Sequence, residues 1–133
     1  MPSSYFNNME TQFNFLQVKE GKTFFARVVV AADPRIDGIK VAEKAGAQIP
    51  SFNMDWLEAA RLGAEKALRA HVDFGGSRVG VEIITVLGTE VDTRQDTVEV
   101  AAFCAAWKAF GHDQSALKIE YDGQWMVCPR EAI

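Results

Sequence analysis

Gly21-Lys22-Thr23-Phe24-Phe25-Ala26-Arg27-Val28 begins a segment rich in aromatic and β-branched residues that continues to Ala31. This composition is typical of a β-strand. Just before it, Lys19-Glu20-Gly21-Lys22 has the composition of a turn. Upstream of the turn, phenylalanine alternates with polar residues, as it does in a half-buried strand. We therefore predict that Glu10–Val18 and Thr23–Ala31 form two paired strands joined by a tight turn.

The middle of the chain contains a break in the strand pattern, followed by a helical pattern. Residues 33–38, with Asp33-Pro34 and Asp37-Gly38, end the second strand, and residues 39–42 are suited to a short edge strand. An amphipathic helix is predicted over residues 54–70, with Ser51 or Asn53 as its N-cap. Its predicted buried face combines apolar and small residues at helical spacing: Trp56, Leu57, Ala60, Gly63, Ala64, Ala67 and Leu68.

A further strand and a second helix are predicted in the next segment. Residues 79–87 form the strand, in which Val79, Val81 and Ile83 share one face, whereas Ile84 and Val86 fall on the other. A tight turn follows at Gly88-Thr89. The pattern Thr93-x-x-Asp96 then resembles a capping box and predicts a helix over residues 94–110, with Gly111 in the C′ position.

This second helix is predicted to be apolar on almost every side, because Glu99 and Lys108 are its main polar residues. A helix of this kind must be covered on most of its surface. Residues 112–133 are one candidate cover, since Asp122-Gly123 is typical of a two-residue hairpin turn. A partner chain is the other candidate, and it would make the protein a dimer or part of a complex.

Four short motifs follow one another at a characteristic spacing. They are Gly21 to Val28, Ala45-Gly46-Ala47-Gln48-Ile49-Pro50, Val91-Asp92-Thr93 and Ala101-Ala102. The series resembles domain IV of the ribosomal translocase, elongation factor G, whose signatures are G-R-G-Q-Y-G-H-V, G-G-x-I-P, V-D-S and I-A-A. The likeness spans residues 21–110, about two thirds of a chain that we interpret as a single domain of residues 1–133 with an added C-terminal hairpin at 112–133.

The resemblance implies an α+β fold of the split β-α-β type, similar to the second domain of ribosomal protein S5. In that fold one mixed sheet carries two helices on one face. In the translocase, two loops at the tip of this domain reach the transfer-RNA–messenger duplex. Here the first loop differs, with Phe24 and Thr23 replacing glutamine and glycine, and the second is shorter and lacks its histidine. The chain has no GTPase domain, so the resemblance implies a related binding domain and not a translocase.

Composition agrees with a single globular domain. The chain has 133 residues and a net charge of −4, which is unusual for a dedicated nucleic-acid binder. No apolar run is long enough for a transmembrane helix, and the N-terminus lacks the pattern of a signal peptide. Cys104 and Cys128 do not form a disulfide framework or a metal-type spacing. We expect a cytoplasmic protein with reduced thiols and no membrane partner.

Basic and aromatic residues suggest one candidate contact surface. Residues 19–44 carry six basic and four acidic side chains, in contrast to the acidic chain as a whole. Charge combined with base stacking could hold single-stranded RNA or a part of the ribosome. The candidate contact residues are Lys22, Phe24, Arg27, Arg35 and Lys40. Strand alternation puts one of Phe24 and Phe25 in the core and the other outside, and the sequence leaves open which. The alternative is a protein–protein or self-association module that uses the second helix and the C-terminal hairpin.

No catalytic or metal-binding arrangement is visible in the sequence. His71 and His112 each lack a second ligand at a suitable spacing on the same element, and Asp92 lacks a partner for acid–base chemistry. Cys104 falls on an apolar surface, where a thiol is usually inert. We therefore expect a non-catalytic protein without a metal or cofactor.

Overall fold

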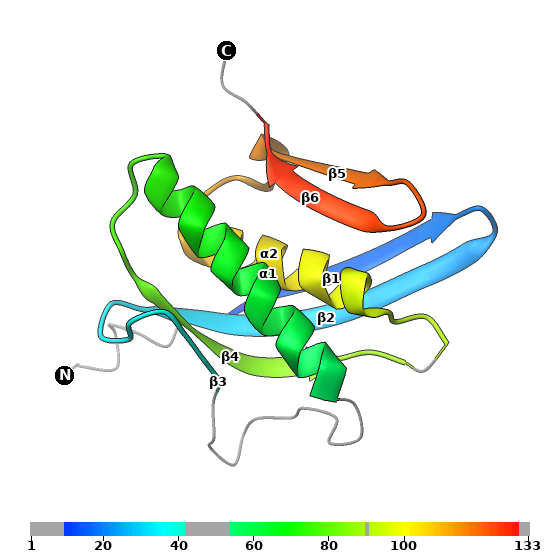
Figure 1. The fold of residues 1–133 in the computed structure, drawn as a ribbon, viewed down its shortest axis with the longest axis horizontal. Helices are drawn as coiled ribbons and strands as arrows, with labels where there is room; N and C mark the ends of the chain where they lie inside the picture. The colour runs from blue at the N-terminus through cyan, green and yellow to red at the C-terminus, as the bar shows by residue number, and fades with distance from the viewer. Residues whose placement is uncertain (1–9, 42–53, 90, 131–133) are drawn as a thin grey trace.

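The computed structural model describes residues 10–41, 54–89 and 91–130 and shows a mixed four-stranded sheet (Figure 1). Its strands lie in the order β1-β2-β4-β3. β1 pairs antiparallel with β2, β2 pairs antiparallel with β4, and β3 runs parallel to β4 at the edge. The bounds are β1 Glu10–Lys19, β2 Lys22–Asp33, β3 Ile39–Val41 and β4 Gly80–Leu87. The predicted hairpin, short edge strand and third long strand are confirmed.

Two helices cover one face of this sheet, as the fold prediction requires (Figure 1). α1 spans Met54–Asp73 and α2 spans Gln95–Ala109. A second, two-stranded sheet follows α2, with β5 at Leu117–Tyr121 and β6 at Trp125–Pro129. The α+β sandwich is therefore confirmed. The predicted N-caps of α1, Ser51 and Asn53, lie outside the described residues, as does residue 42 of the predicted edge strand.

A β-bulge in β4 corrects the predicted placement of Val86. Val30 pairs with Ile83 and the preceding Val29 pairs with Thr85, so Ile84 is an extra residue in the ladder. One extra residue reverses the alternation of side chains that follow it. Val86 therefore returns to the core face, and it is fully buried together with Ile83. The prediction that Ile84 and Val86 share the opposite face was wrong for Val86, because it assumed an unbroken period of two.

The start of α2 also differs from the prediction. The N-cap residue is Arg94 and not Thr93, and the Arg94 backbone N–H donates to Thr97 Oγ1 at 3.4 Å. Thr93 does not cap the helix, because its hydroxyl donates to the carbonyl oxygen of Phe25 and accepts from Thr89 N–H at 2.8 Å. Thr93 therefore ties the loop before α2 to strand β2.

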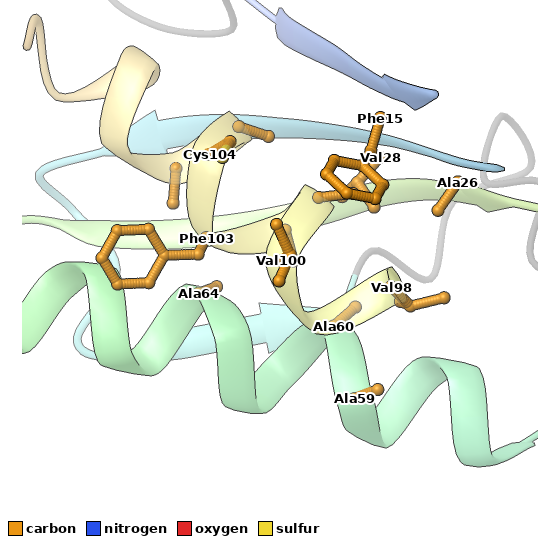
Figure 2. Close-up of a cluster of buried hydrophobic side chains, with 14 of the residues drawn as sticks. Phe15, Ala26, Val28, Ala59, Ala60, Ala64, Val98, Val100, Phe103 and Cys104 are labelled. Atoms are coloured by element: carbon orange, nitrogen blue, oxygen red, sulfur yellow. The ribbon is translucent and has the colours of Figure 1, made fainter. Parts of the chain in front are cut away.

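α2 lies in the centre of the core and is covered within one chain. Its residues from Thr97 to Trp107 are buried apart from Glu99, and the sheet, α1 and β6 all contact it. Figure 2 shows its side chains directed towards α1 on one side and the sheet on the other. From the C-terminal hairpin, Leu117 and Trp125 are both buried in the same cluster. Of the two candidate covers for α2, the C-terminal hairpin is therefore the one that the structure shows.

Gly63 allows the two helices to approach closely. A Cβ atom at this position would collide with the backbone carbonyl of Glu99 in α2. Glycine is normally unfavourable inside a helix by about 1 kcal/mol relative to alanine. The close helix–helix contact accounts for a glycine in the buried face of α1.

Candidate functional site

Two loops meet at the tip of the domain, where β1 turns into β2 and where β4 leads into α2. The Phe25 backbone N–H donates to the carbonyl oxygen of Asp92 at 2.9 Å, and Asp92 N–H donates to Thr89 Oγ1 at 2.9 Å. The side chain of Thr93 fills the space beside Gly88, where a Cβ atom would collide with it. Gly88 therefore leaves room for the Thr93 side chain, which allows the loop with Val91-Asp92-Thr93 to turn back and contact β2.

A cavity of about 350 Å³ opens between these two loops. Gly21, Lys22, Thr23 and Phe24 line it from the hairpin side, and Val91, Asp92 and Arg94 line it from the other loop. Lys22 is exposed, and Val91 is almost fully exposed beside it. The cavity thus combines two cations, one carboxylate and an apolar rim. These groups could hold a phosphate or a small polar segment of a larger partner.

Arg94 is held in place at the cavity by its neighbours. Its guanidinium donates to the carboxylate of Asp96, with Nε 3.0 Å from Oδ1, and its Nη2 donates to the carbonyl oxygen of Gly123 at 3.0 Å. It also lies over the ring of Phe24, 5.3 Å from the centroid, in a cation–π arrangement. A fixed guanidinium loses little conformational entropy when a ligand binds to it.

Asp96 is the partner that orients Arg94. Its Oδ2 also accepts from Trp125 N–H at 2.7 Å, at the start of β6. Burial alone would raise the pKa of Asp96, but the hydrogen bonds from Arg94 and from Trp125 N–H hold this pKa below its ordinary value. The carboxylate is therefore charged at neutral pH and connects the tip to the C-terminal hairpin.

Phe24 does not form the exposed contact that the sequence suggested. Only 3% of its surface is accessible, and its ring packs against Trp125, Tyr121 and the Arg94 guanidinium. Phe25 is the partly exposed member of the pair. The assignment of Phe24 as a contact residue is corrected for this reason. Phe24 lies on the same face of β2 as Ala26 and Val28, and this face is turned to the core.

The other predicted contact residues do not form one surface with Lys22. Arg27 lies further along β2, where its Nε donates to Asn14 Oδ1 at 2.7 Å. Arg35 is beyond the far end of β2 and Lys40 is in β3. β2 contains 12 residues, so its two ends lie roughly 35 Å apart at about 3.3 Å per residue. Arg35 is moreover paired with Asp33, with Nη2 2.9 Å from Oδ2. The basic segment of the sequence is therefore not a basic patch of the surface.

Sequence reasoning missed Arg94 and Val91 as members of the tip. Both lie about 70 residues from Lys22 along the chain, outside the basic segment. The sequence did contain one signal for them, the resemblance of both loops to the tip loops of the translocase. This resemblance implied that residues before α2 would lie beside the β1–β2 turn. A count of basic residues along the sequence does not detect such a pairing.

The two histidines also form a pair that their sequence positions conceal. His71 Nδ1 lies 2.8 Å from His112 Nε2, and His71 Nε2 lies 3.0 Å from the carbonyl oxygen of Ser77. A carbonyl oxygen can only accept, so Nε2 of His71 carries a proton. Burial, together with repulsion from His71, lowers the pKa of His112. The His71 ring fills the space above Gly76, so this pair fastens the C-terminal ends of the two helices.

The thiol of Cys104 is not suited to act as a nucleophile. Burial raises the pKa of Cys104 to about 12, so its thiol is protonated at neutral pH. Within residues 10–41, 54–89 and 91–130, no three histidine, cysteine, aspartate or glutamate side chains gather as a metal site would need. In the same ranges no helix is both long and apolar enough to cross a membrane.

A larger groove of about 460 Å³ lies along the outer side of α1, but four of its charged residues are paired with one another. Glu58 pairs with Arg61 and Glu65 with Arg69, both at 3.7 Å. These exposed pairs are typical of a solvated helix face. The tip cavity is therefore the stronger candidate for a contact surface.

The fold has a counterpart among solved structures. No protein family and no curated protein matches the sequence. The chain is similar in structure to ttk003000868 from Thermus thermophilus, known from a crystal structure, with a TM-score of 0.60 and 19% sequence identity. The match covers 74% of this chain and 15% of the Thermus protein, so the likeness concerns one part of a much longer chain. At this identity the comparison establishes a shared fold.

Proposed function

We propose that this chain is a non-catalytic binding module, similar to domain IV of elongation factor G, whose tip contacts RNA of the translation apparatus. The observation that carries the proposal is the convergence of two loops into one cavity with Lys22 and Arg94 on its walls. These are the loops that correspond to the RNA-contacting loops of the translocase. The proposal concerns binding alone, because it rests on these two loops.

The chemistry of the tip supports a single-stranded RNA ligand. Lys22 is exposed and can neutralise a phosphate, and Arg94 presents a guanidinium that is already oriented by Asp96. Unpaired bases stack on arginine planes as well as on aromatic rings. Arg94 therefore takes the stacking role that the buried Phe24 cannot perform. Asp92 and the overall negative charge limit the contact to a small area of the surface.

The proposal predicts that RNA affinity depends on the charge of Lys22. Labelled single-stranded RNA is titrated at low salt with the unchanged protein and with Lys22→Glu. We expect Lys22→Glu to lower the affinity about tenfold or more, since it replaces a phosphate contact with repulsion. Binding by the unchanged protein should also weaken as salt rises.

The matched control for this experiment is Lys40→Glu. It makes the same change in net charge on β3, near the far end of β2 from the tip. Its affinity is expected to stay within about twofold of the unchanged protein, because it alters only the non-specific attraction that total charge produces. Equal losses of RNA affinity in Lys22→Glu and Lys40→Glu, or no RNA binding by the unchanged protein at low salt, would contradict the proposal that the tip contacts RNA.

The proposal also places the protein in the cytoplasm. Cys104 is buried and Cys128 is exposed, and both are free thiols. Exposed free thiols persist where glutathione and thioredoxin keep them reduced. Alkylation of intact cells followed by mass analysis should find Cys128 reduced, and a disulfide at Cys128 would count against this location.

The alternative function is a protein–protein or self-association module that uses α2 and the C-terminal hairpin, and the hairpin covers α2 within one chain. The surface that now favours association is the outer edge of the four-stranded sheet, at β1.

A further inference from the structure

The outer edge of β1 is unpaired in the described part of the chain. β1 is the first strand in the sheet order β1-β2-β4-β3 and contains 10 residues without proline. Its register with β2 is unbroken from Glu10 to Lys19, so the strand has no bulge. Long regular edge strands readily pair with another strand, and proteins usually prevent this with prolines, bulges or inward charges.

The hydrogen bonds of Phe25 show which backbone groups of β1 face this edge. Phe25 N–H donates to Asp92 and Phe25 C=O accepts from Thr93, so both groups point away from β1. In an antiparallel pair, directly opposed residues either exchange both hydrogen bonds or direct both groups outwards. Leu16 is opposite Phe25, so its own N–H and C=O point to the free edge.

The same reasoning applies to every second residue along β1. The unbroken register assigns the free-edge groups to Glu10, Gln12, Asn14, Leu16 and Val18. Their side chains lie on the outer face of the sheet, since Phe15 between them is buried on the helix side. Leu16 and Val18 are 61% and 64% exposed, which leaves an apolar strip beside the unpaired backbone.

From this edge we propose that β1 pairs antiparallel with β1 of a second copy of the chain, about a two-fold axis at Asn14. This register uses every free group of the edge. Glu10 is opposite Val18 of the second copy, Gln12 is opposite Leu16, and Asn14 is opposite Asn14. On the helix side, the partly buried Phe13 then lies opposite Phe15 of the second copy.

Charge and space both favour this antiparallel arrangement. Glu10 and Lys19 lie at opposite ends of β1, so antiparallel pairing brings the acidic end of one strand to the basic end of the other. Parallel pairing would place like charges together. A groove of about 570 Å³ separates Gln17 and Lys19 from the C-terminal hairpin. The hairpin therefore leaves room at this end of β1 for the beginning of the second strand.

The proposed register is tested first by cross-linking. Both variants carry Cys128→Ser, which removes the exposed thiol. With Asn14→Cys, the two new cysteines face each other with Cα atoms about 5.5 Å apart, within disulfide reach. With Gln12→Cys they are four residues apart along the ladder, roughly 13 Å. On a non-reducing denaturing gel after equilibration in a glutathione buffer, we expect a disulfide-linked dimer for Asn14→Cys and no covalent cross-link for Gln12→Cys. Equal cross-linking of both variants would overturn the proposed register.

Sedimentation tests the contribution of the backbone. The unchanged protein should be a dimer at high micromolar concentration. Leu16→Pro removes one free-edge N–H and keeps the β1–β2 hydrogen bonds, and should be a monomer. Leu16→Thr keeps that N–H and should remain a dimer. A monomeric unchanged protein, or a dimeric Leu16→Pro, would refute the proposal. These results do not depend on RNA, so they separate this surface from the tip.

Discussion

A chain that ends at Gly111 is expected to aggregate instead of folding. The shortened chain lacks β5 and β6, which cover one side of α2. Leu117 and Trp125 belong to the buried core, and Trp107 of α2 also donates its indole N–H to the carbonyl oxygen of Asp113 at 3.3 Å. Without this cover, α2 would expose a large apolar surface to water, and such surfaces drive association.

This prediction is checked by circular dichroism and sedimentation of the shortened chain. The matched control ends at Arg130 and keeps the whole hairpin, so it should fold and sediment like the full chain. A shortened chain that stays soluble and unfolds cooperatively would show that α2 needs no cover from residues 112–130.

Phe103→Ala is expected to lower the free energy of unfolding by about 3–5 kcal/mol. Phe103 is 3% exposed, and Figure 2 shows it on the side of α2 that faces α1. The neighbouring residues of α1 are alanines, which are too short to fill the space that the ring would leave. The loss therefore combines reduced apolar burial with a cavity.

Urea denaturation of the two proteins measures this difference directly. Phe74→Ala is the control, because it removes the same ring from a position that is 56% exposed. Its effect should be under about 1 kcal/mol, as is usual for surface substitutions. Equal denaturation midpoints for Phe103→Ala and the unchanged protein would mean that the ring contributes little to the core.

The helices and strands could be predicted from the sequence because apolar residues recur in them at regular intervals. The polar–apolar alternation in β1 and the helical spacing of small residues in α1 both reflect a face turned to the core. The bulge at Ile84 could not be predicted in this way. In the sequence, a single extra residue gives the same pattern as apolar residues that move to the opposite face of a regular strand. The choice of Arg94 over Thr93 as N-cap depended on Thr93 reaching Phe25, a contact between segments about 70 residues apart.

The candidate site was harder to predict from the sequence than the fold. The assignment of Lys22 to the tip agrees with its position beside the cavity, whereas Arg35 and Lys40 lie near the other end of the sheet. A charge count along the chain assumes that neighbours in sequence are neighbours on the surface. An extended strand of 12 residues breaks that assumption. The pairing of His71 with His112 was missed for the converse reason, because tertiary packing alone brings their helix ends together.

The position of Arg94 has a consequence for the C-terminal hairpin. One guanidinium holds both the carboxylate of Asp96 and the carbonyl oxygen of Gly123, and Asp96 in turn holds Trp125 N–H. An anion bound at the tip cavity shares the Arg94 guanidinium with these oxygens and therefore weakens its hydrogen bond to Gly123 in the hairpin turn. Coupling of this kind is reciprocal, so loosening the hairpin frees a cation at the tip. Occupancy of the tip should then be measurable as faster hydrogen exchange at residues 122–125.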